Sequence, residues 1–194
     1  MRLPWISAAV AAIGLAVACV PGGAEALQYD RVRVAEGAVW LLQSGQPAHW
    51  TARMALLDLG MLAGLGAWLE ARGERRDLVF ALSLGAIGTA LAVHFLSPDL
   101  LVYRGSSGLA SALFVLIALR IVRTSGGAGR ALALLAVALF LAKAGWESLT
   151  GQALFAGPLA PGVRVVPLVH LLGGVAGAAA EGWARAGHRL RSWA

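Results

Sequence analysis

Six long apolar runs constrain the fold of this chain more than any other feature. They cover residues 4–20, 52–70, 77–97, 107–122, 131–149 and 165–186. Most of them have the length that a helix needs to cross a hydrocarbon core about 30 Å thick. Because lipid offers the backbone no water to bind, these runs predict an all-α membrane protein with a single domain over residues 1–194.

Composition excludes several classes of protein. Charged residues make up 13% of the chain, whereas soluble domains contain about 25%. The net charge of +6 could indicate nucleic-acid binding, but the arginines form short clusters between apolar runs, so we expect no nucleic-acid partner. One cysteine and four scattered histidines predict neither an internal disulfide nor a metal site, and nothing in the chain calls for a cofactor.

The arginines also predict the topology. Six spans place both termini on one side of the membrane, and most arginines fall on that side: Arg2, Arg72, Arg75, Arg76, Arg120, Arg123, Arg130, Arg185, Arg189 and Arg191. By the positive-inside rule this side is cytoplasmic. Residues 1–26 also have features of a cleaved signal peptide, but the six runs form a more balanced set if the first is kept as a span.

The segment that enters the fourth run is the leading candidate for a catalytic site. Ser106 and Ser107 lie between Gly105 and Gly108, on the external side by the topology above. Glycine lets a substrate approach the backbone closely, and a helix N-terminus offers N–H groups that stabilise a developing negative charge. The 107–122 run covers only about 24 Å, so we expect Ser107 to be recessed in a wet pocket. An ordinary loop followed by a helix start is the alternative.

His170 is the candidate base for Ser107. It lies about one and a half turns into the last run, at a depth that matches that of Ser107. Gly173 and Gly177 fall near its face and would let another helix pack closely. A histidine that is hydrogen-bonded within the bundle or lines a proton path fits the same spacing equally well.

Other ionisable groups also fall inside the runs. Asp58 lies in the second, where a carboxylate is expected to be protonated, paired or hydrated. Lys143 and Glu147 are four residues apart in the fifth, and we expect a structural ion pair. A small proton-coupled transporter would use such residues too, but the chain has no inverted repeat of broken helices.

Together these residues resemble a known family. Gly105, Ser107 and Gly108 at the start of the fourth run, with His170 followed by Gly173 and Gly177, resemble the motifs of rhomboid intramembrane serine proteases, and more narrowly those of rhombosortases. Supporting segments are Tyr29-Asp30-Arg31, residues 37–49, Ser97-Pro98-Asp99-Leu100, and Lys143 with Trp146 and Glu147.

The resemblance implies a six-helix rhomboid-like bundle in the bacterial cytoplasmic (inner) membrane, with its active site facing the periplasm. It implies that Ser107 is the nucleophile and His170 the general base and acid, with no third acid. The implied partners are the lipid bilayer and the transmembrane segments of exported proteins, whose C-terminal tail combines a Gly-Gly-like motif, an apolar helix and a basic end.

One part of the rhomboid pattern is missing. Rhomboids carry a histidine and, four residues later, an asparagine that help to form the oxyanion hole, and the matching positions here are Met54 and Asp58. A protonated Asp58 could donate in their place, with Gly105 and Ser106 helping to position the substrate. The departure leaves open a pseudoprotease that binds transmembrane helices without cutting them.

Overall fold

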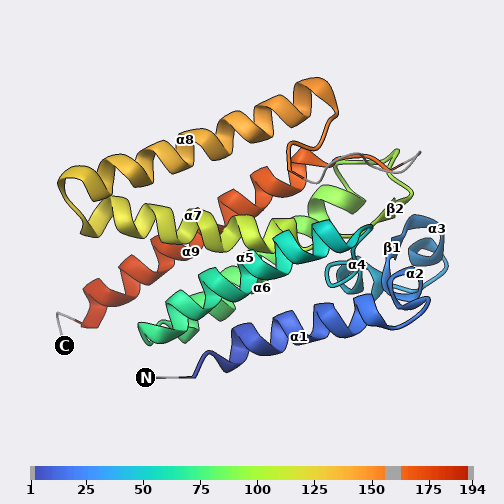
Figure 1. Ribbon diagram of the computed structural model, residues 1–194, viewed down its shortest axis with the longest axis horizontal. Coiled ribbons are helices and arrows are strands. Elements are labelled where there is room, and N and C mark those ends of the chain that lie inside the picture. The colour runs from blue at the N-terminus through green and yellow to red at the C-terminus, as the bar shows by residue number, and fades with distance from the viewer. Residues whose placement is uncertain (1–2, 156–162, 192–194) are drawn as a thin grey trace.

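The computed structural model describes residues 3–155 and 163–191, and most of them are helical (Figure 1). The long helices are α1 (Trp5–Cys19), α5 (Ala52–Ala71), α6 (Arg75–His94), α7 (Ser107–Thr124), α8 (Gly127–Thr150) and α9 (Pro167–Arg191). Between α1 and α5 lie α2 (Gly23–Leu27), β1 (Tyr29–Asp30), α3 (Arg31–Ala35) and α4 (Leu41–Ser44), and β2 (Val102–Tyr103) precedes α7. The β1–β2 pair is the one addition to the all-α prediction among these residues.

Four of the described helices, α5, α6, α7 and α8, are long and apolar enough to cross a membrane, and α1 is a shorter apolar helix. The chain therefore has the character of an all-α membrane protein. The beginning of α1 and the end of α9 lie at one end of the bundle, while α2, α3, α4 and the strand pair lie at the other (Figure 1). We call these the terminal end and the loop end.

Several predicted helix boundaries differ from those of the structure by two to five residues. The third run was expected to continue to Ser97, but α6 ends at His94. The Arg31 guanidinium explains this early end, because it donates to the carbonyls of Val93 (2.9 Å), His94 (2.9 Å) and Ser97 (3.0 Å). Helix α7 continues two residues beyond the predicted end, and its 18 residues span about 27 Å.

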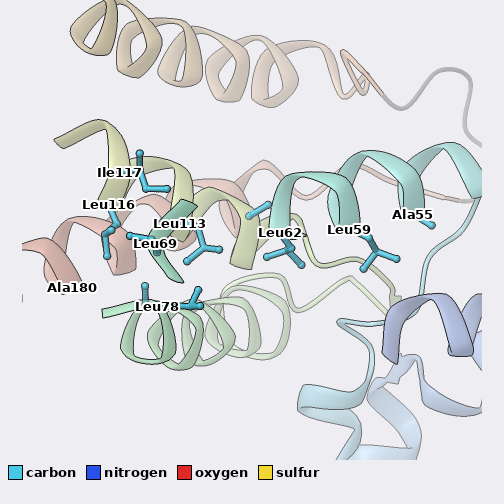
Figure 2. Close-up of a cluster of buried hydrophobic side chains, with 11 residues drawn as sticks. Ala55, Leu59, Leu62, Leu69, Leu78, Leu113, Leu116, Ile117 and Ala180 are labelled. Carbon is cyan, nitrogen blue, oxygen red and sulfur yellow. The ribbon is translucent and has the colours of Figure 1, made fainter. Parts of the chain in front are cut away.

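Helix α7 is the centre of the bundle. It packs against α5, α6, α8 and α9, whereas α1 packs mainly on α5, and α8 is peripheral. Figure 2 shows leucines of α5, α6 and α7 meeting in the core, with Leu62, Leu78, Leu113 and Leu116 almost fully buried. Burial of these apolar groups against one another fixes which face of each helix points inward.

A carboxylate fastens α1 to α5. Glu70 is fully buried near the end of α5 and accepts hydrogen bonds from the N–H groups of Ile6 (3.3 Å) and Ser7 (2.8 Å) and from the Ser7 hydroxyl (2.7 Å). It thus satisfies free N–H groups at the start of α1, where the helix dipole favours a negative charge. Helix α1 is docked as one of the bundle helices.

An ion-pair network joins three helices at the terminal end. Arg120 of α7 is 95% buried and contacts Glu74 (2.6 Å), Asp77 (3.0 Å) and Glu181 (2.8 Å). Arg123 contacts Glu181 as well (2.9 Å), but 41% of its side chain is exposed. The sequence places these residues near the ends of different helices, and only folding brings them together.

We expect Arg120→Leu to lower the free energy of unfolding by about 3–5 kcal/mol, because it leaves three carboxylates without their shared cation. Arg123→Leu is the control and should cost about 1 kcal/mol or less, since its one carboxylate keeps Arg120 as a partner. Unfolding by sodium dodecyl sulfate in mixed micelles measures both values. Equal losses for the two variants would show that the network does not depend on Arg120.

Candidate active site

A strand pair and a glycine turn set the position where α7 begins. Tyr29 of β1 lies opposite Tyr103 of β2 in antiparallel register, and the N–H of Gly105 donates to the carbonyl of Gly45 (3.1 Å). Gly105 has a φ of +142°, a conformation that side chains other than glycine rarely adopt. The chain turns there and enters α7 at Ser107, at the loop end of the bundle (Figure 1).

Arg104 holds this turn against the segment between α1 and α5. Its side chain is 9% exposed and donates to Glu25 (3.0 Å) and to the side-chain oxygen of Gln28 (2.9 Å). The guanidinium also lies 4.2 Å from the centre of the Trp50 ring, a separation that suits a cation–π contact. Arg104 thus fastens part of the segment between α1 and α5 to the candidate site.

Helices α7 and α9 touch backbone to backbone. A Cβ atom at Gly173 would collide with the Gly108 carbonyl, and one at Gly177 would collide with the Ala112 carbonyl. These contacts are one helical turn apart on each helix, so the close approach continues along a full turn. The expected packing role of Gly173 and Gly177 is therefore present in the structure.

This approach places the backbones of the two predicted catalytic residues on neighbouring turns. Ser107 directly precedes Gly108, and His170 lies three residues before Gly173, so both side chains belong to turns that flank the glycine contact. Ser107 and His170 are each half-buried. In the described structure no hydrogen bond joins them, and the nearest partners of His170 lie on α8.

The other serine belongs to a separate polar cluster. The N–H of Ser106 donates to Asp58 Oδ2 (3.1 Å), and His49 Nε2 lies 3.2 Å from Ser106 Oγ and 3.4 Å from Asp58 Oδ2. Ser106 is only 2% exposed. Ser106 is therefore more enclosed than Ser107, which is half-buried. Asp58 acts here as an acceptor that positions the turn before α7.

Tyr103 places a buried hydroxyl beside Ser107. Its oxygen is buried and has no hydrogen-bond partner among the described residues, and a Cβ on Gly105 would lie 3.4 Å from it and 3.8 Å from Asp58 Oδ2. Burial raises the pKa of Tyr103 well above its usual value; the Asp58 carboxylate adds to the rise and the nearby Ser107 side chain opposes it. The hydroxyl therefore keeps its proton at neutral pH and can donate to a group that enters the site.

A carboxylate and an ammonium group lie beside His170. Its Nδ1 atom is 3.0 Å from Glu147 Oε2 and 3.2 Å from Lys143 Nζ. Lys143 and Glu147 form the expected ion pair at 2.7 Å. The predicted dyad had no third acid, so the position of Glu147 against His170 is a structural finding that changes that view of the site.

The predicted positioning residues lie on two elements. Asp58, Gly105 and Ser106 lie around the start of α7, and Met54 is half-buried at the start of α5, where its N–H donates to Thr51 Oγ1 (3.2 Å). His49 and Tyr103 were missed. The sequence did offer a signal for His49. This histidine lies just before the second run, in which Met54 occupies the position of the expected histidine donor.

A cavity of about 260 Å³ extends from Ser106 between α1, α5 and α6. Its lining is mainly apolar and includes Val10, Ile13, Leu59 and Leu62, with Gln43 and Gln46 on the α4 side. Within residues 3–155 and 163–191, no three histidine, cysteine, aspartate or glutamate side chains are grouped in a way that could hold a metal ion. The chemistry available at this end is thus that of hydroxyl, imidazole and carboxylate groups.

Comparisons of the chain with protein-family models and with curated proteins gave no match.

Gly173→Ala should lower the free energy of unfolding by about 1–3 kcal/mol, because the new methyl group forces α9 away from the Gly108 carbonyl. Gly182→Ala, in the same helix, is the matched control. Nothing lies within 4 Å of a Cβ at that position, so the change should be neutral or stabilising by up to about 1 kcal/mol. Unfolding titrations in mixed micelles compare the two, and similar values would contradict a tight α7–α9 contact.

Proposed function

We propose that this protein is a membrane-embedded serine endopeptidase of the rhomboid type, close to the rhombosortases. The observation that carries the proposal is the backbone contact between Gly108 and Gly173, which sets Ser107 and His170 on neighbouring turns at one end of a helical bundle. Serine hydrolysis needs a nucleophile and a base, and this contact supports pairing a serine at a helix start with a histidine on the neighbouring turn.

The proposed reaction uses two steps. Ser107 Oγ attacks the carbonyl carbon of the scissile bond while His170 Nε2 takes the hydroxyl proton. The C–N bond then breaks, and the departing amine receives that proton, which leaves an acyl ester on Ser107. Water attacks the ester, its proton passes to His170 and then to Ser107 Oγ, and the carboxylic acid product leaves.

In this proposal the Tyr103 hydroxyl donates a hydrogen bond to the oxyanion. Its hydroxyl is buried, unpartnered among the described residues and adjacent to Ser107, so it is ready to donate when a substrate carbonyl enters. The N–H groups at the start of α7 add a favourable dipole. Asp58 then serves to hold Ser106 and the turn, in place of the donor role that the sequence suggested.

The proposed setting is the bacterial inner membrane, with six spans formed by the long helices and the terminal end in the cytoplasm. The arginine-rich turns at the terminal end support this orientation through the positive-inside rule. The loop end would then face the periplasm, where exported proteins present their C-terminal anchors. Glycines in such an anchor ease local unwinding, which a protease needs because it binds extended backbone.

Substrate side chains have a candidate binding region. The cavity beside Ser106 is lined mainly by apolar groups of α1 and α5 and opens next to the start of α7. An apolar residue beside the scissile bond would fill it, and the glutamines at its α4 side would contact the unwound backbone.

Labelling with a fluorophosphonate tests the nucleophile. We expect the purified protein to react, Ser107→Ala to lose the label, and Ser106→Ala to keep it, because Ser106 is buried against His49. His170→Ala should lose labelling and cleavage of a Gly-Gly-tailed substrate. Labelling that survives Ser107→Ala but not Ser106→Ala would move the nucleophile to the neighbouring serine. An unlabelled protein that still binds the tail would be a pseudoprotease.

Tyr103→Phe tests the oxyanion donor. The change removes one hydroxyl that has no partner in the described structure, so the unfolding free energy should stay within about 0.5 kcal/mol of the original. We expect kcat to fall by about 10²-fold or more with little change in KM, since the hydrogen bond forms in the transition state. Tyr29→Phe is the matched control, because the Tyr29 hydroxyl contacts His94 instead (3.1 Å). Unchanged kcat in Tyr103→Phe would remove Tyr103 from the reaction.

A further inference from the structure

The packing of α8 does not explain why Glu147 is buried. Helix α8 is peripheral, and of its 24 residues only Ala133, Ala144 and Glu147 are buried. The Glu147 side chain is 3% exposed and has three polar neighbours: Lys143 Nζ (2.7 Å), His170 Nδ1 (3.0 Å) and the N–H of Leu154 (3.1 Å). An exposed i,i+4 ion pair would need none of this enclosure.

We propose that Glu147, held by Lys143, is a positioning residue that fixes the orientation and the tautomer of His170. This inference rests on the proposed serine-protease function. It replaces a simple Ser-His dyad with a Ser107–His170–Glu147 arrangement in which the carboxylate comes from α8.

The hydrogen-bonding capacities of the three groups support one arrangement. Lys143 can only donate, and its shorter contact is to Glu147 Oε2 (2.7 Å), compared with 3.2 Å to His170 Nδ1. The same carboxylate oxygen lies 3.0 Å from Nδ1 and accepts from an N–H there. The proton of a neutral imidazole is then on Nδ1, so Nε2 is left with a lone pair.

That lone pair is what the proposed reaction requires. Nε2 must be unprotonated to take the proton of Ser107, and a carboxylate on Nδ1 also stabilises the imidazolium that forms. Lys143 supplies a compensating charge, so the buried carboxylate is not isolated. Among the described residues, α6 and α7, which also pack against α9, place no charged side chain within ion-pair distance of His170.

Glu147→Met is an informative variant because it removes the Oε2 atom that contacts both Lys143 Nζ and His170 Nδ1. Among the described residues, Lys143 then keeps His170 Nδ1 (3.2 Å) as its neighbouring acceptor. An ammonium group can only donate, so Nδ1 becomes the acceptor and the imidazole proton moves to Nε2, where it blocks proton transfer from Ser107.

Nitrogen-15 NMR of histidine-labelled protein in nanodiscs reads the tautomer directly. His170→Asn identifies the His170 signals among those of the four histidines. We expect Nδ1 to carry the proton in the original protein and Nε2 to carry it in Glu147→Met. Finding the proton on Nε2 in the original protein would overturn the inference. This measurement does not depend on whether a variant at position 147 folds.

Kinetics give the second readout. Glu147→Met should lower kcat by about 10⁴-fold while KM changes little, as expected for the wrong tautomer, and Glu147→Asp should keep part of the activity. Glu181→Met is the matched control: it breaks a buried carboxylate pair at the terminal end, so stability should fall while kcat and the His170 tautomer stay the same. Unchanged kcat in Glu147→Met overturns the inference.

Different results would contradict the protease function and the role of Glu147. Activity that survives both Ser107→Ala and His170→Ala sinks the protease proposal, whatever the tautomer. If both of those variants are inactive while Glu147→Met is fully active, only the role of Glu147 is lost.

Discussion

Where α7 passes α9, the carbonyl of Gly108 rests against Gly173 with no room for a side chain on either helix. In lipid, apolar side chains gain little by leaving one apolar medium for another, so close backbone packing of this kind contributes much of the helix association. Ser107 and His170 flank this contact, so the proposed reaction depends on it. Separating the helices by the width of one methyl group would enlarge the distance over which the proposed proton transfer takes place.

Polar groups hold the remaining elements around this pair. Arg120 gathers carboxylates from α6 and α9 at the terminal end, while Glu70 closes the start of α1. At the loop end, Arg31 ends α6 and Arg104 secures the turn before α7. Unpaired charges are costly at membrane depth, so each cluster has few acceptable arrangements. Helix α8 lies on the outside of the bundle, and its buried Glu147 faces His170 across the interface with α9.

Much of the fold was predictable because apolar runs of spanning length leave the backbone little choice other than a helix. Helices α5, α7, α8 and α9 begin within four residues of the predicted positions, and the packing glycines of α9 lie where predicted. The end of α6 was misplaced because Arg31, far away in the chain, takes its last carbonyls. The β1–β2 pair was also unpredicted, since strands of two residues carry no usable pattern.

By itself, the sequence determined the helical membrane class, the order of the long helices and the presence of a serine and a histidine at the starts of α7 and α9. Hydrophobic length and local turn chemistry act over a few residues, which is why a pattern can reveal them. Only the tertiary structure decided that His49 contacts Ser106, that Tyr103 leaves its hydroxyl free beside Ser107, and that Glu147 faces His170. Those outcomes depend on how each helix is rotated and on how the α1–α5 segment folds back, and both are set by contacts between residues far apart in the chain.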